Sequence, residues 1–180
     1  ISDCVFENNS GYYGGCLYNG NSGTIQSSYQ NIIFRNNTAY HGSVIYGTQE
    51  ATFERCVFFG NDATGPTNGV FQNEGGAPTI VNCTFADNND YAIGRHSATD
   101  TTNIINCIFF GNLGTLTEVS NTSKFSITYS NDPDNFTGIG NINQNPLFVN
   151  SSSGDYTLQS SSPCIDAGDP SSQYNDPDGT

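Results

Sequence analysis

Two short acidic stretches have the residue types and spacing that calcium prefers. Asp176 and Asp178 alternate with proline and glycine near the end of the chain, and Asp132 and Asp134 flank a proline. Ca²⁺ uses oxygen ligands spaced in this way, although neither stretch is followed by the bidentate glutamate of an EF-hand loop. We predict Asp176 and Asp178 as the metal ligands, with calcium as the one cofactor suggested. A plain turn without metal is the alternative for both stretches.

One charged cluster could be drawn as a catalytic site for a sugar polymer. Arg55 directly follows Glu54, and Asp3 stands at the same place before a similar motif. A polysaccharide lyase would need calcium ligands beside a basic residue, and an inverting glycosidase would need two carboxylates about 6.5–9.5 Å apart. A solvated ion pair on an outer face is the simpler interpretation of Glu54 and Arg55.

The remaining residues with catalytic potential form no known pattern. His41 and His96 are the only histidines, and neither stands in a metal-binding spacing such as His-Glu-x-x-His. The sequence also has no Gly-x-Ser-x-Gly nucleophile elbow. We therefore predict no catalytic residue and leave the binding residues open. Whether the protein is an enzyme stays undecided, with a non-catalytic role favoured.

The elements that position these residues belong to a sequence repeat. A six-residue motif occurs five times in the chain. The copies are Cys4–Asn9, Ile32–Asn37, Cys56–Asn61, Cys83–Asn88 and Cys107–Asn112. Their phenylalanines are 24 to 28 residues apart. A period of 20 to 50 residues is typical of solenoids, in which each coil packs on its neighbours. Variable spacing indicates fixed strands joined by loops of different length.

The columns of the motif predict which side chains face inward. The first residue of each copy and its phenylalanine lie two apart, so both face the same side of a strand. We predict one buried stack of Phe6, Phe34, Phe58, Phe85 and Phe109, with Cys4, Ile32, Cys56, Cys83 and Cys107 beside it. We also predict a hydrogen-bonded ladder of the final asparagines, at a corner of the chain: Asn9, Asn37, Asn61, Asn88 and Asn112.

A second apolar column stands three residues before the first. Its members are Ile1, Tyr29, Phe53, Ile80 and Ile104. The odd offset means that the two columns cannot belong to one flat strand. We therefore expect a bend between them, at the polar column Asp3, Asn31, Arg55, Asn82 and Asn106.

A weaker repeat follows the corner asparagines. Residues 13–20 match residues 40–47 at a shift of 27, and residues 68–73 and 91–94 continue the pattern. Each period thus supplies two or three short strands, and helical periodicity is absent. These observations predict an all-β, parallel β-helix of about five coils. An ordinary β-sandwich is the alternative.

The paired motifs resemble a known group of proteins. Phe-x-x-Asn followed by Gly-Gly-x-Leu or Gly-x-Val-Ile, over residues 1–112, resembles the repeats of chlamydial polymorphic outer-membrane proteins and related right-handed parallel β-helix surface proteins. Residues 145–149, 154–158 and 162–170 are similar to the C-terminal cap of secreted bacterial β-helix proteins. The resemblance implies right-handed coils over 1–112 and an irregular last coil with a capping segment over 113–180, packed as one domain.

Composition agrees with an extracellular solenoid. Four basic residues oppose seventeen acidic ones, for a net charge of −13, which disfavours nucleic acid and anionic membranes as partners. No apolar run approaches the ~20 residues of a membrane-spanning helix. The sequence begins inside a repeat without Met, so we expect it to be part of a longer chain or assembly. Whether any of the six cysteines are oxidised stays open.

We therefore expect a secreted or cell-surface structural or adhesive segment of a larger protein, without catalytic activity. The alternative is a carbohydrate-active enzyme, either a polysaccharide lyase or a glycosidase. A surface protein and a carbohydrate are the partners to consider. The outward column beside the phenylalanines would be an apolar stripe, and we expect residues 113–150 or a partner to cover it: Val5, Ile33, Val57, Thr84 and Ile108.

Overall fold

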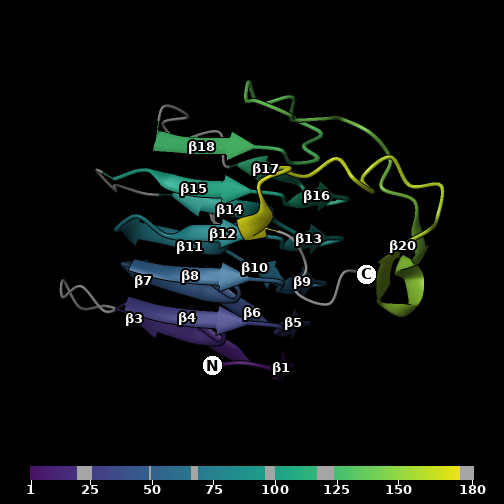
Figure 1. The fold of residues 1–180 in the computed structure, drawn as a ribbon. Coiled ribbons are helices and arrows are strands. Elements are labelled where there is room, and N and C mark those ends of the chain that lie inside the picture. The colour runs from purple at the N-terminus through teal and green to yellow at the C-terminus, as the bar shows by residue number, and fades with distance from the viewer. Residues whose placement is uncertain (20–25, 49, 66–68, 96–99, 117–123, 175–180) are drawn as a thin grey trace.

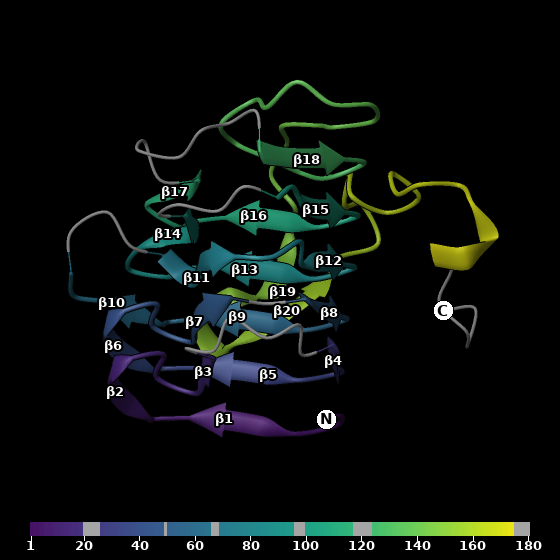
Figure 2. The same ribbon diagram turned by 90° about the vertical axis from the view of Figure 1, so that its left-hand side faces the viewer.

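The computed structural model describes residues 1–19, 26–48, 50–65, 69–95, 100–116 and 124–174. In these segments short strands follow one another around a common axis, and each turn of the chain stacks on the turn before it (Figures 1 and 2). The N-terminus lies at one end of the stack. None of the helical turns in these segments is long and apolar enough to cross a membrane.

The strands form four parallel sheets along the stack, which each turn of the chain passes in the order I, II, III, IV; the first strand, β1, belongs to sheet II. Sheet I contains β4 (Gln26–Gln30), β8 (Glu50–Glu54), β12 (Thr79–Val81), β15 (Thr102–Ile105) and β18 (Phe125–Thr128). Sheet II contains β1 (Val5–Glu7), β5 (Ile33–Arg35), β9 (Val57–Phe59), β13 (Thr84–Ala86) and β16 (Ile108–Phe110). Sheet III contains β2 (Ser10–Tyr13), β6 (Thr38–His41) and β10 (Asp62–Ala63). Sheet IV contains β3 (Leu17–Asn19), β7 (Ile45–Thr48), β11 (Gly69–Gly75), β14 (Tyr91–Arg95) and β17 (Gly114–Leu116).

This arrangement confirms the predicted parallel β-helix. Sheets I, II and IV have five strands each, so the chain completes about four turns between the first and last strand of a sheet, slightly fewer than the five coils expected. The strands β17 and β18 lie beyond residue 112 and continue the stack by pairing with β14 and β15.

The core consists of ladders of equivalent residues. The five motif phenylalanines stack as predicted, with neighbouring ring centroids 4.3 to 5.3 Å apart; four are fully buried, and Phe6 in the first coil is half-buried. Cys56, Cys83 and Cys107 are buried beside them, and all six cysteines are free thiols. The prediction was wrong for Cys4, which is exposed. Cys4 lies in the first coil, and within this chain that coil has a neighbour on one side only.

The two predicted corners follow from left-handed residues. Asp3, Asn31, Arg55, Asn82 and Asn106 all have φ between 52° and 55°, which turns the chain from sheet I into sheet II. At the second corner the left-handed residue is the one before the final asparagine, namely Asn8, Asn36, Gly60, Asp87 or Gly111. Asparagine, aspartate and glycine tolerate this conformation better than other residues.

The predicted asparagine ladder is present at the second corner. Asn61 is fully buried, and its Nδ2 donates to the carbonyl of Phe34 and to Oδ1 of Asn88, both at 3.0 Å. Its Oδ1 accepts from the backbone N–H and the side-chain amide of Asn37, also at 3.0 Å. The ladder therefore satisfies buried backbone groups that the sheets leave unpaired at the turn.

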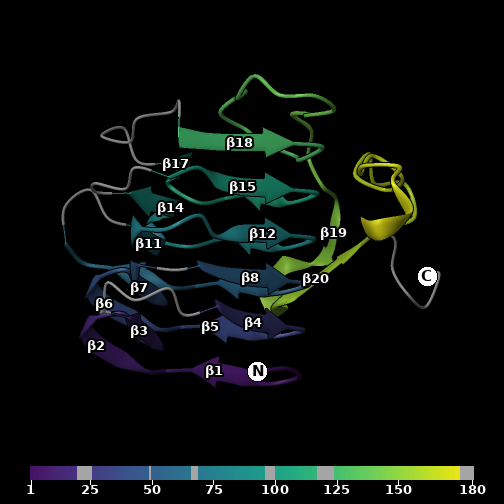
Figure 3. The same ribbon diagram turned by 60° about the vertical axis from the view of Figure 1, so that its left-hand side comes forward.

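A C-terminal hairpin covers part of the outer face of sheet II. Strand β19 (Phe148–Asn150) pairs antiparallel with β20 (Asp155–Leu158) through a short 3₁₀ turn, η2 (Ser151–Ser153), and Figure 3 shows the hairpin alongside the coils. The ring of Tyr156 lies 5.0 Å from Phe59, and that of Phe148 lies 6.2 Å from Phe110. Ala86, between Phe59 and Phe110 in the sheet, is fully buried although it faces outward.

The outward stripe is thus covered only in part. Val57, Thr84 and Ile108 are half-buried, whereas Val5 and Ile33 in the first two coils stay exposed. The ring contacts of this cover come from Phe148, inside the 113–150 segment that we expected, and from Tyr156, beyond it.

Candidate functional site

The predicted calcium ligands lie outside the described residues, and so does His96. Asp176 and Asp178 fall in the segment 175–180, and His96 in the segment 96–99. The second acidic stretch is described and forms a turn. The buried carboxylate of Asp132 accepts the backbone N–H of Asp134 at 3.1 Å and of Phe136 at 2.7 Å. Among the described residues, no three His, Cys, Asp or Glu side chains group as a metal site would need.

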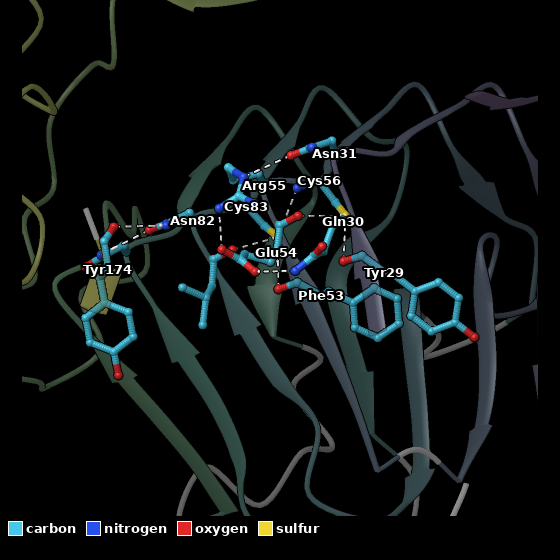
Figure 4. Close-up of polar contacts among 12 residues, drawn as sticks. Tyr29, Gln30, Asn31, Phe53, Glu54, Arg55, Cys56, Asn82, Cys83 and Tyr174 are labelled. Atoms are coloured by element: carbon cyan, nitrogen blue, oxygen red, sulfur yellow. Dashed lines mark hydrogen bonds and ion pairs between the residues drawn. The ribbon is translucent and has the colours of Figure 1, made fainter. Parts of the chain in front are cut away.

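The cluster around Arg55 is a line of hydrogen bonds along the first corner (Figure 4). Arg55 Nε donates to Asn31 Oδ1 at 2.9 Å, and the amide of Asn31 donates to Asp3 Oδ1 at 3.0 Å. The Asn31 amide, with a second hydrogen bond from Ser2, lowers the pKa of Asp3. Glu54 pairs with Arg55 and accepts a 2.8 Å bond from Gln30.

The same column continues toward the C-terminal segment. The amide of Asn106 donates to Asn82 Oδ1 at 3.0 Å, and the amide of Asn82 donates to the carbonyl of Tyr174 at 3.2 Å. The backbone N–H of Asp169 donates to Asn106 Oδ1 at 2.7 Å. The charged residues of this column therefore bond along the surface of the solenoid, and the column anchors the C-terminal segment to the coils.

A cluster that the sequence did not predict lies where sheets III and IV meet. Six aromatic side chains from the first two coils form a continuous surface, named the aromatic patch: Tyr12, Tyr13, Tyr18, Tyr40, His41 and Tyr46. They come from β2, β3, β6 and β7. The parallel register places Tyr13 beside His41 and Tyr18 beside Tyr46.

Rings in neighbouring coils stack as three pairs. Tyr12 and Tyr40 lie 5.0 Å apart at 11°, and Tyr13 and His41 lie 5.2 Å apart at 9°. Tyr18 and Tyr46 lie 6.0 Å apart at 18°. These distances are close to the ~4.8 Å spacing of paired strands, so the sheet itself sets the spacing of the rings.

Rings of different pairs meet at steeper angles. Tyr12 meets Tyr13 edge-on at 4.8 Å and 80°, and Tyr40 meets His41 at 4.7 Å and 90°. Tyr13 links to the third pair through Tyr46, at 4.8 Å and 46°. Stacked and edge-to-face contacts are the favoured aromatic geometries, so the six rings hold one another in place.

A glycine turn brings the pairs together. Gly14 and Gly42 follow Tyr13 and His41, and each has a φ of 59°. A Cβ on Gly14 would lie 2.1 Å from the carbonyl oxygen of Leu17, so only glycine fits the turn.

The patch is open to solvent and has an acidic neighbour. Tyr12, Tyr13, Tyr18 and Tyr40 are 38–61% exposed. Burial raises the pKa of Tyr46, and the carboxylate of Glu74 raises it further. Glu74 accepts a 3.1 Å hydrogen bond from Gln72, which pairs with Tyr46 in the sheet. The patch thus combines aromatic rings, phenolic hydroxyls and a negative charge.

The repeat predicted from the sequence, which matches residues 13–20 with residues 40–47, is one residue out of register with the structure. The expected shift of 27 matched Tyr13 with Tyr40, but the structure pairs Tyr13 with His41, a shift of 28. Phe6 and Phe34 are also 28 residues apart, so the spacing of the phenylalanines predicts the correct register for the patch. At that shift, each tyrosine in the first coil meets an aromatic ring in the second.

One buried acid stands apart from both clusters. Asp90 is almost fully buried, and burial raises its pKa to about 7, with a smaller contribution from Asp62. Its Oδ1 accepts the N–H of Tyr91 at 2.7 Å, and its Oδ2 has no partner among the described residues.

Comparison with known proteins identifies the scaffold. A family model described as "Right handed beta helix region" matches residues 1–164. Neither curated proteins nor solved structures gave a match. The match covers most of the chain and agrees with its parallel coils and asparagine corners. The chain therefore belongs to the right-handed β-helix family.

Proposed function

We propose that the chain is a secreted or cell-surface β-helix segment of a larger protein, with a structural and adhesive role, and that the aromatic patch is its binding surface. The observation that carries the proposal is the patch: six mutually contacting rings, four of them tyrosines open to solvent. Tyrosine is enriched at recognition surfaces because its ring supplies apolar contact and its hydroxyl supplies a hydrogen bond.

The scaffold supports this role by holding the rings in place before a partner arrives. Each ring projects from a short strand that is hydrogen-bonded to a neighbouring coil. Binding to a preorganised surface orders few additional side chains, and this lowers its entropic cost. The acidic composition and the resemblance of the repeats to those of surface proteins support an extracellular location. Cleavage of the protein by protease added to intact producing cells tests that location.

Retention by the immobilised chain tests the binding role. The probes are neutral and acidic polysaccharides and acidic and basic proteins. Replacing Tyr12, Tyr18 and Tyr40 together with serine should abolish retention of whichever probe binds. Replacing three exposed apolar residues outside the patch with serine is the matched control and should change nothing: Ile139, Val149 and Ile165.

The same samples test the enzymatic alternative. New reducing or unsaturated ends, formed by the parent chain and lost when Arg55 is replaced by glutamine, would contradict a non-catalytic role. Equal retention by the patch variant and the control variant would contradict the assignment of the binding surface.

A further inference from the structure

We infer that the aromatic patch binds a basic polypeptide segment, whose Lys or Arg side chains lie against the tyrosine rings. This rests on the proposed function and names the partner of the same surface. The rings are the first support, because the face of an aromatic ring is negative and attracts a cation that lies within ~6 Å of the ring centre. Tyr40 stays 38% exposed although its strand β6 has a neighbouring strand on each side, so ammonium or guanidinium groups can reach the patch there as well as in the first coil.

Charge is the second support. Gln72 pairs with Tyr46 in the sheet and donates a 3.1 Å hydrogen bond to Glu74, so a carboxylate lies at the margin of the patch. Neither lysine nor arginine occurs in β2, β3, β6 or β7, the strands that carry the rings. Arg35 and Arg55, on other parts of the coil, each pair with a glutamate, and Arg95 ends β14, which pairs with β11 on the side away from β7. A cationic partner therefore meets the carboxylate of Glu74, and none of the four strands that carry the rings has a Lys or Arg to repel it.

The net charge of −13 adds a long-range attraction for the same class of partner. A field of one sign raises the association rate of an oppositely charged ligand and repels ligands of like charge. An acidic polysaccharide would be repelled, and a neutral sugar would gain nothing from Glu74 or from this field.

The shape of the patch favours an extended chain over a single small cation. Three stacked pairs lie side by side over two coils and offer several ring positions at once. Side chains on one face of an extended peptide recur every second residue, about 6.6 Å apart, so neighbouring basic side chains can reach different pairs. Several weak contacts on one chain then add up.

Titration of the full chain with a fluorescent Lys/Arg-rich peptide tests the inference. The reference peptide carries glutamine at each basic position and should bind at least tenfold more weakly. Tyr12→Leu and Tyr18→Leu keep the apolar bulk without the ring, and each should weaken binding about two- to fivefold. Tyr18→Phe should retain most of the affinity because it keeps the ring.

Charge variants separate the local carboxylate from the total charge. Glu74→Gln should weaken binding and reduce its dependence on salt. Asp166→Asn makes the same charge change at an exposed site in the C-terminal segment and should have little effect. Thermal unfolding of each variant reports whether it is folded. If one of Tyr12→Leu, Tyr18→Leu and Glu74→Gln does not fold, the other two still test the inference.

Several results would overturn the inference. They are equal binding of the basic and glutamine peptides, unchanged affinity in the leucine variants, or equal losses in Glu74→Gln and Asp166→Asn. If the basic peptide fails but a neutral oligosaccharide binds in a patch-dependent way, this inference falls and the proposed binding role stands. If loss of the three tyrosines changes the retention of no probe, both fall.

Discussion

The asparagine ladder should contribute more to stability per residue than any surface contact of this chain, and Asn61→Ala tests this. The side chain of Asn61 makes four hydrogen bonds, all of 3.0 Å, to Phe34, Asn37 and Asn88. Each net hydrogen bond contributes about 0.5–1.5 kcal/mol, so their loss predicts a decrease of about 2–6 kcal/mol in the free energy of unfolding. Asn61 is fully buried, so bulk solvent does not reach the groups that lose the amide.

Asn9→Ala is the matched control in the same column. Asn9 is exposed, and its amide donates to Asn37 Oδ1 at 2.9 Å. After the substitution Asn37 Oδ1 still accepts the backbone N–H of Asn9 at 3.0 Å, so the expected loss is below about 1 kcal/mol. Asn112→Ala, at the half-buried opposite end of the ladder, should fall between the two.

Urea denaturation measures these differences as shifts of the midpoint at constant slope. The predicted order of destabilisation is Asn61 first, then Asn112, then Asn9. Equal losses at Asn61 and Asn9 would refute the reasoning, because they would show that burial and the number of partners do not determine the contribution of a ladder position.

Three further perturbations test the core, the buried acid and the hairpin. Phe85→Ala should cost about 3–5 kcal/mol in denaturant unfolding, and a loss below about 1 kcal/mol would contradict a tightly packed stack. Because the pKa of Asp90 is raised to about 7, the folded chain keeps a proton between about pH 4 and pH 7 that the unfolded chain releases, so stability should fall as pH rises through this window. Asp90→Asn should remove that slope and increase stability at pH 8 by about 1–3 kcal/mol, and an unchanged pH profile would contradict the burial of a protonated acid. Phe148→Ala should loosen the hairpin, seen as faster amide hydrogen exchange at Ala86, and unchanged exchange there would show that the hairpin does not protect sheet II.

The core and the corners were predictable from sequence because their residue types repeat. Phenylalanine recurs in every coil and predicts the inward face. Asparagine, arginine or aspartate recurs before each motif and predicts the bend. The buried state of Asp90 was not predictable, because the Asp-Asn-Asn-Asp run around it is typical of a solvated turn. The register of the coils places Asp90 level with Ala63 and Ala39, in an inward column of small residues.

The site and the hairpin depend on features that occur only once or twice. The aromatic patch involves two coils, and an error of one residue in their alignment separates Tyr12 from Tyr40 and Tyr13 from His41. The hairpin joins residues far apart in sequence, as in the 3.1 Å bond from the Tyr156 hydroxyl to Asp87. No repeat encodes such a contact, so a periodic pattern cannot predict it.

The central claim is that the aromatic patch is the binding surface of this β-helix and prefers a cationic chain. Its most direct test is an NMR titration of the full chain with the Lys/Arg-rich peptide, in which the ring resonances of the tyrosines and of His41 are followed individually. We predict saturable shifts at Tyr12, Tyr13, Tyr18 and Tyr40, with Tyr156 in the hairpin unchanged. Shifts spread evenly over all assigned tyrosines, or absent from these four, would contradict the claim.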